Sequence, residues 1–352
     1  MKVASLNRAF KKSGTPAKIK LGLALQGGGS YGAFTAGALR ALMEHKSFRD
    51  GSIEIIGVSG TSSGAGNGAI LCDSLLEGGP DAVIKNMRSY WRDIQSYGQG
   101  LELLPHLQFW ARYPNLPPLL LEYGQIFAKL SSIRPQDTLK QLISKRIHNW
   151  ERLGSKPPYL FTNTVRAACE NGKKEHVVFD KHSPETIICS ANLREFGPYF
   201  IDGHYYYDGA EANNPCLEPL ESLDEITDLL AITLHKSPDK SQKPAHQDEI
   251  IQQSQEQEGF MITHEINAHL DQIHHDPDKT YHLHEIALEP HPQWNDTSRM
   301  NFMSSWIKQL YDMGYETAQT WLKENADKLG HESSYSVNIR PQTQCNALNR
   351  AL

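Results

Sequence analysis

The sequence is poor in cysteine and shows no pairing pattern among the few that it has. Five cysteines occur in 352 residues, an odd number, and none of them forms a Cys-x-x-Cys pair. Small secreted domains that depend on disulfides usually carry an even number of cysteines at close spacing. The count therefore argues against a disulfide framework and predicts a reducing compartment, the cytoplasm.

Long apolar runs are also absent. No window of about 18 unbroken apolar residues exists, and a membrane-spanning helix needs such a length. Residues 1–20 contain basic side chains but no apolar segment of the kind that a secretory signal has, so no cleaved signal peptide is expected. Secretion by a route that needs no cleaved signal stays open.

An excess of positive charge is lacking as well. The chain carries 35 Lys and Arg against 41 Asp and Glu, a formal net charge of −6, with the two signs well mixed. Nucleic-acid-binding proteins usually show a basic domain or stripe, so this class is disfavoured. No metal site is expected either, because His264 and His269 lie five positions apart, whereas the zinc-binding helix motif needs histidines four apart.

The sequence does contain a repeated strand–turn–helix pattern near its N-terminus. An apolar strand over 18–26 runs into glycines at 27–32 and a helix from about 33 to 44. A second strand over 53–58 leads into a glycine-serine turn and a small-residue helix over 65–76. This alternation is typical of an α/β domain with a parallel sheet.

Three parts follow from the distribution of these patterns. Residues 1–18 are expected to be a flexible tail, residues 19–235 the main domain, and residues 236–352 a helical and strand extension packed on it. Residues 95–135 include an apolar, proline-broken stretch that suits a cap or lid, with ordinary core packing as the alternative. Further strands are expected at 159–168, 176–179, 199–207, 229–234 and 281–288, and helices at 80–94, 135–152, 303–325 and one ending near 274.

The glycines at 27–32 match the pattern GxGxxG through Gly27, Gly29 and Gly32. Between a strand and a helix, such a loop exposes backbone N–H groups beside the positive end of the helix. Those donors can bind a phosphate, or the oxyanion of an acyl-transfer intermediate. A dinucleotide site is the usual rival, so the loop alone leaves a nucleotide-binding oxidoreductase open.

The turn at 60–64 matches GxSxG through Gly60, Ser62 and Gly64. Its place between a strand and a helix is that of a nucleophile elbow, a strained turn that projects the serine hydroxyl while the glycines relieve crowding. A glycine-rich turn without chemistry is the alternative. Ser59 and Ser63 flank the candidate, but the match around Ser59 lacks the closing glycine, so Ser62 is the preferred nucleophile.

Asp208-Gly209-Ala210 follows a tyrosine-rich strand and offers a base. A serine hydroxyl needs a base, and an aspartate serves if it is held ionised at hydrogen-bond distance. Because an unperturbed Asp has a pKa of about 3.9, position and desolvation must supply the missing basicity. Most Asp-Gly pairs are plain turns, and Asp202-Gly203 is expected to be a hairpin turn of this kind.

The histidines need a separate interpretation. Those between 264 and 291, among them His282 and His284, are interpreted as a solvated, pH-sensitive surface. A Ser-His-Asp triad stays open at this point, because a histidine from anywhere in the chain could fold back beside Ser62.

The three motifs in this order resemble the patatin-like phospholipase family. Residues 23–34 are similar to its bacterial members, and so are residues 207–215, where an Asn-Pro pair follows the aspartate. The similarity runs from about residue 20 to 235, with a weaker likeness around 306–321. One departure is Tyr31, where many members carry a basic residue, so the preference for a lipid head group is left open.

The resemblance implies a three-layer α/β/α hydrolase with a Ser–Asp dyad and no cofactor. Ser62 is then the nucleophile and Asp208 the proton acceptor, with Gly27, Gly28 and Gly29 as the oxyanion hole. The implied reaction is hydrolysis of fatty-acyl esters of glycerolipids by a peripheral enzyme that meets a membrane or micelle from the water side. A patatin-like binding protein that kept the fold but lost the activity is a further alternative.

Overall fold

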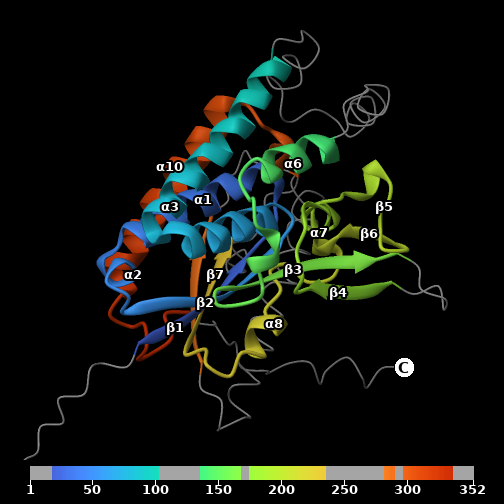
Figure 1. Ribbon diagram of the computed structural model, residues 1–352. Coiled ribbons are helices and arrows are strands. Elements are labelled where there is room, and N and C mark those ends of the chain that lie inside the picture. The colour runs from blue at the N-terminus through green and yellow to red at the C-terminus, as the bar shows by residue number, and fades with distance from the viewer. Residues whose placement is uncertain (1–17, 103–134, 168–173, 235–280, 290–295, 336–352) are drawn as a thin grey trace, which may run out of the picture.

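The computed structural model describes residues 18–102, 135–167, 174–234, 281–289 and 296–335. They build one eight-stranded sheet with helices on both sides (Figure 1). The predicted three-layer α/β/α fold with a mostly parallel sheet is confirmed. Most of the candidate cap, the helix expected to end near 274 and the histidines at 264 and 269 lie outside the described residues.

The strands lie in the order β5–β6–β3–β2–β1–β7–β8, and β4 pairs with β3 beside this path. β3, β2, β1, β7 and β8 are parallel to one another, whereas β4 and β6 pair antiparallel with β3, and β5 with β6. The bounds are β1 (Ile19–Leu25), β2 (Ile53–Thr61), β3 (Tyr159–Arg166), β4 (Glu175–Phe179), β5 (Tyr199–Ile201), β6 (His204–Asp208), β7 (Asp228–Thr233) and β8 (His282–Ala287). Because β1 and β2 are adjacent and parallel, the loops after their carboxyl ends emerge side by side.

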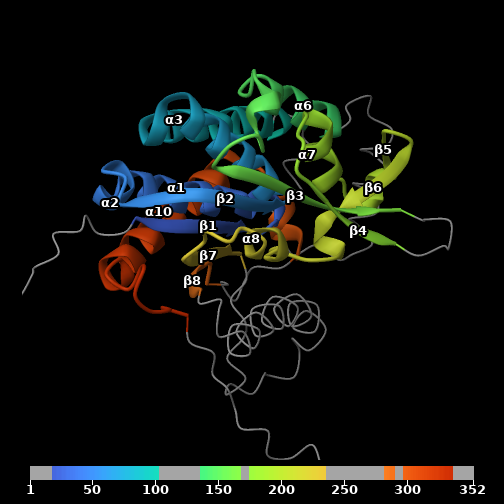
Figure 2. The same ribbon diagram turned by 60° about the horizontal axis from the view of Figure 1, so that its bottom comes forward.

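Helices cover the two faces unequally. The described helices are α1 (Gly32–Glu44), α2 (Lys46–Arg49), α3 (Ser63–Glu102), α6 (Pro135–Ser144), α7 (Pro184–Ser190), α8 (Glu218–Glu221) and α10 (Ser304–Asn325), with 3₁₀ turns η1 (Gly29–Tyr31), η2 (Trp150–Arg152), η3 (Arg194–Phe196), η4 (Gly209–Glu211) and η5 (Asp296–Met300). Figure 2 shows α3 on one side of the sheet and α8 on the other.

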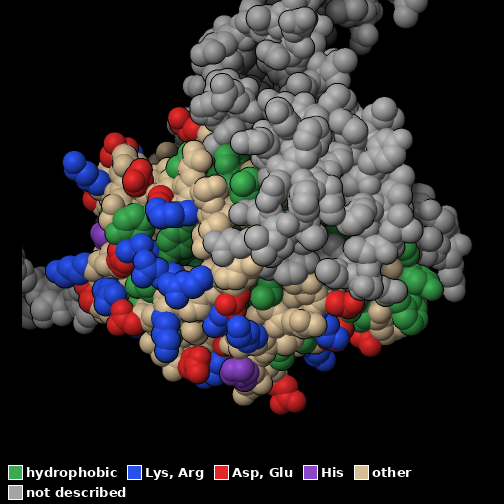
Figure 3. Space-filling model, turned by 90° about the horizontal axis from the view of Figure 1, so that it is seen from above, with side chains coloured by type: hydrophobic (Ala, Val, Ile, Leu, Met, Phe, Trp, Pro, Cys, Tyr) green, Lys and Arg blue, Asp and Glu red, His purple; other side chains and the backbone are tan. Residues whose placement is uncertain are grey.

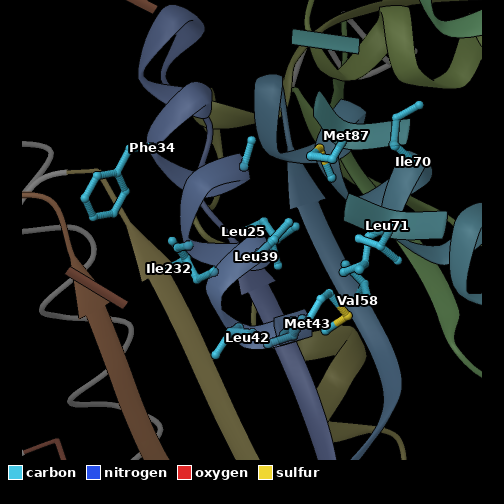
Figure 4. Packing of buried hydrophobic residues seen from close by; sticks show 14 of the residues in the cluster. Leu25, Phe34, Leu39, Leu42, Met43, Val58, Ile70, Leu71, Met87 and Ile232 are labelled. Carbon is cyan, nitrogen blue, oxygen red and sulfur yellow. The ribbon is translucent and has the colours of Figure 1, made fainter. Parts of the chain in front are cut away.

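Two apolar cores follow from the alternation of side chains along β1. Leu21, Leu23 and Leu25 face the larger core, which α1, α3 and α10 complete, whereas Ala24 faces the smaller core beside α8. Figure 4 shows the larger core, where side chains of α1 and α3 meet those of the sheet. Each fully buried leucine contributes roughly 1.5–3 kcal/mol to the stability of the fold.

α1 and α10 cross where each helix has a glycine. A Cβ atom on Gly37 would lie 1.9 Å from the carbonyl oxygen of Tyr311, and one on Gly314 would lie 1.9 Å from that of Phe34. The two backbones therefore touch, and no larger residue fits at either position. This contact fixes α10 against the first strand–loop–helix unit.

Several sequence expectations change in detail. The helices expected at 65–76 and 80–94 are one element, α3, with a break at Gly78 and Gly79, where Gly79 has φ of 68°. The helix expected to reach residue 152 ends at Ser144, and α7 was not expected. α7 begins at a capping box, in which Ser183 and Thr186 exchange hydrogen bonds and Pro184 fills the first helical position.

Other expectations about loops and histidines can also be compared with the fold. Asp202 and Gly203 form the predicted hairpin turn, with φ of 48° and 81°, as a two-residue turn of this hand requires. The prediction of a solvated histidine surface is wrong for His284, which is fully buried because Asp228 and Ser334 bind its two ring nitrogens. Within the described ranges, no helix is long and apolar enough to cross a membrane.

Candidate active site

Ser62 occupies the turn between β2 and α3 in a strained conformation. Its φ is 54°, one of two positive values among the described residues other than glycine. Left-handed backbone costs a serine free energy, and such strain is typical of a nucleophile elbow. The Ser62 N–H donates to Ser190 Oγ at 2.9 Å, so α7 holds the backbone of the turn.

The glycines of GxSxG are required by close backbone packing. A Cβ atom on Gly64 would lie 2.2 Å from the carbonyl oxygen of Leu25, and one on Gly60 would lie 2.6 Å from that of Gly64. Both contacts are closer than real Cβ atoms tolerate, so the turn needs glycine on each side of Ser62. The first turn of α3 can then lie against the end of β1.

The neighbouring serines have other roles. Ser59 lies inside β2 and is only 1% exposed, so its hydroxyl faces the protein interior. Ser63 Oγ accepts a hydrogen bond from the Gly28 N–H at 3.2 Å and so links the elbow to the glycine loop. Ser62 alone of the three combines partial exposure with the strained turn.

The glycine loop lies directly against the elbow. A Cβ atom on Gly27 would lie 2.7 Å from Ser62 Cβ, so only glycine permits this approach. Gly29 has φ of 57° and lies beside η5, where a Cβ atom would be 2.5 Å from the carbonyl oxygen of Arg299. The loop therefore places backbone N–H groups next to the predicted nucleophile.

Asp208 is the last residue of β6 and lies at the end of the sheet where the parallel strands have their carboxyl ends. The strand register pairs Thr61 with Asn163, and the next residue of β3, Thr164, with Asp208. Asp208 is only 3% exposed, and its Oδ1 accepts from the Ala210 N–H at 2.8 Å, which caps η4. Burial and this bond hold the carboxylate in one place beside β3, the strand that pairs with the elbow strand β2.

The segment after Asp208 reaches back to both of the other motifs. Asn214 binds the Gly27 peptide in both directions: its Oδ1 accepts from the Gly27 N–H at 2.7 Å, and its Nδ2 donates to the Gly27 carbonyl at 3.2 Å. The carbonyl of Asn213 accepts from Thr61 Oγ1 at 3.4 Å. The three predicted motifs thus form one hydrogen-bonded unit.

No hydrogen bond joins the Ser62 hydroxyl to another residue in the described part of the chain. The described histidines nearby have other partners: His176 binds Asn163, and His182 binds the carbonyl of Leu160 at 2.7 Å. Nor do the described residues bring together three or more potential metal ligands. His176 and His182 are therefore already engaged in contacts other than one with Ser62.

Tyr31 is a core residue. It is only 3% exposed, and its ring centroid lies 6.3 Å from that of Trp306 in α10. Trp306 Nε1 also donates to Ser30 Oγ at 3.2 Å. The loop position where many patatin-like proteins carry a basic side chain is here used to pack α10 against the loop.

Sequence reasoning missed the polar residues that hold the site together. Ser190 lies on the unexpected α7, and Asn163 lies inside β3, where a buried amide leaves no motif in the sequence. Asn214 belongs to the Asn-Pro pair whose position was noted, and its hydrogen bonds to Gly27 give that pair a physical role.

Comparison with family models gives a match over much of the chain. The model described as patatin-like phospholipase matches residues 23–220, which is more than half of the chain. The match begins in β1, ends in α8 and includes Ser62, Asp208 and the glycine loop. A search of curated proteins gives no significant match.

Three of the solved structures with some similarity come from two bacteria. VipD from Legionella pneumophila is 15% identical, with 84% of this chain and 67% of that chain covered and a TM-score of 0.31. ExoU of Pseudomonas aeruginosa is 14% identical, with 88% and 53% covered and a TM-score of 0.34. The structure of ExoU in its heterodimeric complex with SpcU, from the type III secretion system, is 16% identical to this chain. The match covers 89% of this chain and 52% of that chain, with a TM-score of 0.33. The chain thus spans about half the length of ExoU.

Proposed function

Because the chain belongs to the patatin-like phospholipase family, we propose that it is a serine acyl hydrolase that cleaves fatty-acyl esters of phospholipids or related lipids. Ser62 is the nucleophile and Asp208 the proton acceptor. The observation that carries the proposal is the strained φ of Ser62, at an elbow bounded by the glycine loop and by the strand that pairs with β6. Strain of this kind persists where the surrounding structure enforces it, and it clusters at active sites.

The reaction runs in two steps. Asp208 takes the proton of the Ser62 hydroxyl while Oγ attacks the ester carbonyl carbon, which forms an oxyanion. The intermediate collapses, the alcohol or lysolipid leaves with the proton from Asp208, and the acyl group stays on Ser62. Water then attacks this ester, Asp208 takes a proton from it, and Ser62 recovers that proton as the fatty acid leaves.

The hydrogen bonds of the glycine loop indicate which of its backbone N–H groups are available as oxyanion donors. The Gly27 amide is buried and bound to Asn214, so its role is to hold the loop in place. Gly28 and Gly29 are partly exposed, and the Gly28 N–H has only the longer bond to Ser63 Oγ at 3.2 Å. Gly29 begins η1, where the first N–H groups have no intrahelical partner. These two amides are therefore the preferred oxyanion donors.

In the proposed reaction the Asp208 carboxylate lies within hydrogen-bond distance of the Ser62 hydroxyl. Catalytic hydrogen bonds are often long or absent before substrate binds and shorten in the reacting complex. Ser62 is partly exposed while Asp208 is buried, so a substrate that excludes water from Ser62 would strengthen the interaction between them.

Contact with a lipid surface is proposed to be peripheral. On the face seen in Figure 3, Lys and Arg side chains lie among Asp and Glu side chains on the part that described residues form. Exposed basic residues of α3 include Lys85, Arg88 and Arg92. Side chains of this kind can contact the anionic groups of a membrane or micelle. Location in the cytoplasm stays a prediction.

The test is product analysis with purified protein. Phospholipid vesicles and a short-chain acyl ester are incubated with wild type, Ser62→Ala and Asp208→Asn, and products are identified by mass spectrometry. Both variants are expected to lose roughly a thousandfold or more in rate with an unchanged melting temperature, because each removes a group that acts only with the other. Ser96→Ala, an exposed serine on α3, is the matched control.

Two outcomes would contradict the proposal. Wild-type turnover by Ser62→Ala would exclude Ser62 as the nucleophile. No turnover by wild type, together with no labelling of Ser62 by a fluorophosphonate, would favour the catalytically silent binding protein. The oxidoreductase alternative gains no support from the site, because Ser62 and Asn214 already lie against Gly27 in the glycine loop.

A further inference from the structure

One buried amide lies at the centre of the candidate site. Asn163 in β3 is 0% exposed, and its Nδ2 donates to Thr61 Oγ1 at 3.1 Å, to the Gly209 carbonyl at 3.0 Å and to the Asn213 carbonyl. Thr61 directly precedes Ser62, and Gly209 directly follows Asp208. A single NH₂ group thus contacts the elbow and the aspartate loop at once.

The orientation of this amide is determined by its neighbours. Two of the three groups around Nδ2 are backbone carbonyls, which only accept, so the nitrogen and not the oxygen must face them. On the other side, Oδ1 of Asn163 faces Nε2 of His176 in β4. His176 therefore carries a proton on Nε2 and donates it to Asn163.

Backbone packing around Asn163 is equally close. A Cβ atom on Gly209 would lie 2.3 Å from the Asn163 carbonyl oxygen, so the glycine after Asp208 is required by the presence of β3. A second contact of His176, its Nε2 at 3.9 Å from Cys216 Sγ, also lies on the segment that follows the aspartate. β4 is thus connected to the aspartate loop through two side chains.

We propose that Asn163, oriented by His176, is a positioning residue that fixes the placement of Asp208 relative to Ser62. The inference rests on the proposed function. If the amide is lost, the Gly209 and Asn213 carbonyls lose a buried donor, and the aspartate loop shifts away from the elbow. A misplacement of about 1 Å is enough to reduce the rate roughly a hundredfold. Asn163 is fully buried and cannot touch the substrate, so binding of the substrate is expected to change little.

Three substitutions test this placement in the full chain. Asn163→Asp keeps the shape but replaces the donor with an acceptor, and kcat is expected to fall about 100-fold with KM within about threefold of wild type. His176→Leu removes the donor to Asn163, and kcat is expected to fall about tenfold. His176→Gln restores an N–H donor of similar reach, and kcat is expected to return to within about threefold of wild type.

The controls separate positioning from a merely structural role. His331→Leu, at an exposed position after α10, should leave kcat unchanged. Melting temperatures are measured for all variants, and labelling of Ser62 by a fluorophosphonate gives the rate of nucleophile activation independently of lipid binding. If Asn163→Asp does not fold, the two His176 variants still decide the question, because rescue by glutamine requires a donor at this place.

The outcomes that overturn the inference differ from those that overturn the proposed function. Wild-type kcat and labelling rate in His176→Leu would overturn the positioning role, as would a loss that glutamine does not rescue. If Ser62→Ala, assayed in parallel, retains full turnover, the proposed function fails instead.

Discussion

Two groups of serine and aspartate side chains lie at opposite ends of the parallel strands. At the carboxyl end, Ser62 occupies a strained elbow and Asp208 ends β6, and no described histidine binds Ser62. At the amino end, Asp228 Oδ1 lies 2.9 Å from His284 Nε2, and Ser334 Oγ lies 3.0 Å from His284 Nδ1. By residue type, the second group matches a catalytic triad better than the first.

The hydrogen bonds of the second group argue against a catalytic role for it. The Ser334 N–H donates to His284 Nδ1 at 3.3 Å, so the nitrogen that would act as a base already accepts from the backbone. Asp228 also accepts from the Gly330 N–H at 2.8 Å and from Thr227 Oγ1 at 2.7 Å. The bonds of Ser334 and Gly330 tie the segment after α10 to the sheet. Ser62 has a positive φ and lies against the glycine loop, whereas Ser334 has no such strain, so we expect the chemistry at the carboxyl end.

The largest effects are expected from a pair of matched aspartate substitutions. Asp208→Asn should reduce ester hydrolysis roughly a thousandfold or more and leave the free energy of unfolding within about 1 kcal/mol, because the amide keeps the cap of η4. Asp228→Asn should leave kcat of the folded protein unchanged but lower the stability. The measurements are initial rates and urea unfolding. Loss of hydrolysis in an Asp228→Asn protein that stays folded would contradict the structural role of the amino-end group.

A second prediction concerns the histidine of the amino-end group. His284→Leu leaves the buried carboxylate of Asp228 without its ring partner, and the free energy of unfolding is expected to fall by about 3–5 kcal/mol. Burial alone would raise the pKa of Asp228, but hydrogen bonds from His284, Gly330 and Thr227 outweigh it and lower that pKa. The exposed His148→Leu serves as control in the same denaturation series and should change stability by less than about 0.5 kcal/mol.

The sequence predicted the strand–loop–helix units at the ends of β1 and β2 far better than it predicted the order of the strands in the sheet. The strand–loop–helix units around 27–32 and 60–64 have strong local patterns, because glycine is needed wherever backbones approach closely. The order of β3, β4 and β6 in the sheet depends on pairing between distant segments, which no local pattern encodes. Asn163 and Ser190 were missed for this reason.

The histidine interpretation failed for a related reason. A histidine in a polar stretch of sequence is usually solvated, and His282 and His284 were treated alike. His282 and His284 are two positions apart in β8 and therefore lie on the same face, and what buries His284 is its contact with Asp228, 56 positions earlier. Burial of a polar ring is decided by whether such a partner exists, and this information lies in the fold alone.

A third prediction concerns His182, a buried histidine that, unlike His284, has no carboxylate bound to it. His182 binds the Leu160 carbonyl and lies 3.4 Å from Thr162 Oγ1, and burial lowers its pKa to about 4. The unfolded chain, with an ordinary pKa near 6.5, binds the proton first, so stability falls as the pH drops from about 6.5 toward 4. About 2 kcal/mol should be lost at pH 5 relative to pH 8. Urea unfolding of His182→Gln, which keeps a donor to Leu160, should show a flatter pH dependence, and an unchanged slope would exclude His182 as its origin.

The smallest effect is expected at Ser334, and it decides whether the amino-end group has any reactivity. Ser334→Ala removes one hydroxyl contact with His284 but keeps the backbone N–H bond to the same nitrogen, so the free energy of unfolding should fall by only about 1 kcal/mol. Hydrolysis should be unchanged, because the nitrogen that would have to accept the Ser334 proton is already occupied. The decisive measurement is fluorophosphonate labelling of Ser62→Ala followed by peptide mass spectrometry. A label on Ser334 would mean that residue types alone suffice for activation, whereas an unlabelled protein would assign reactivity to the strained elbow.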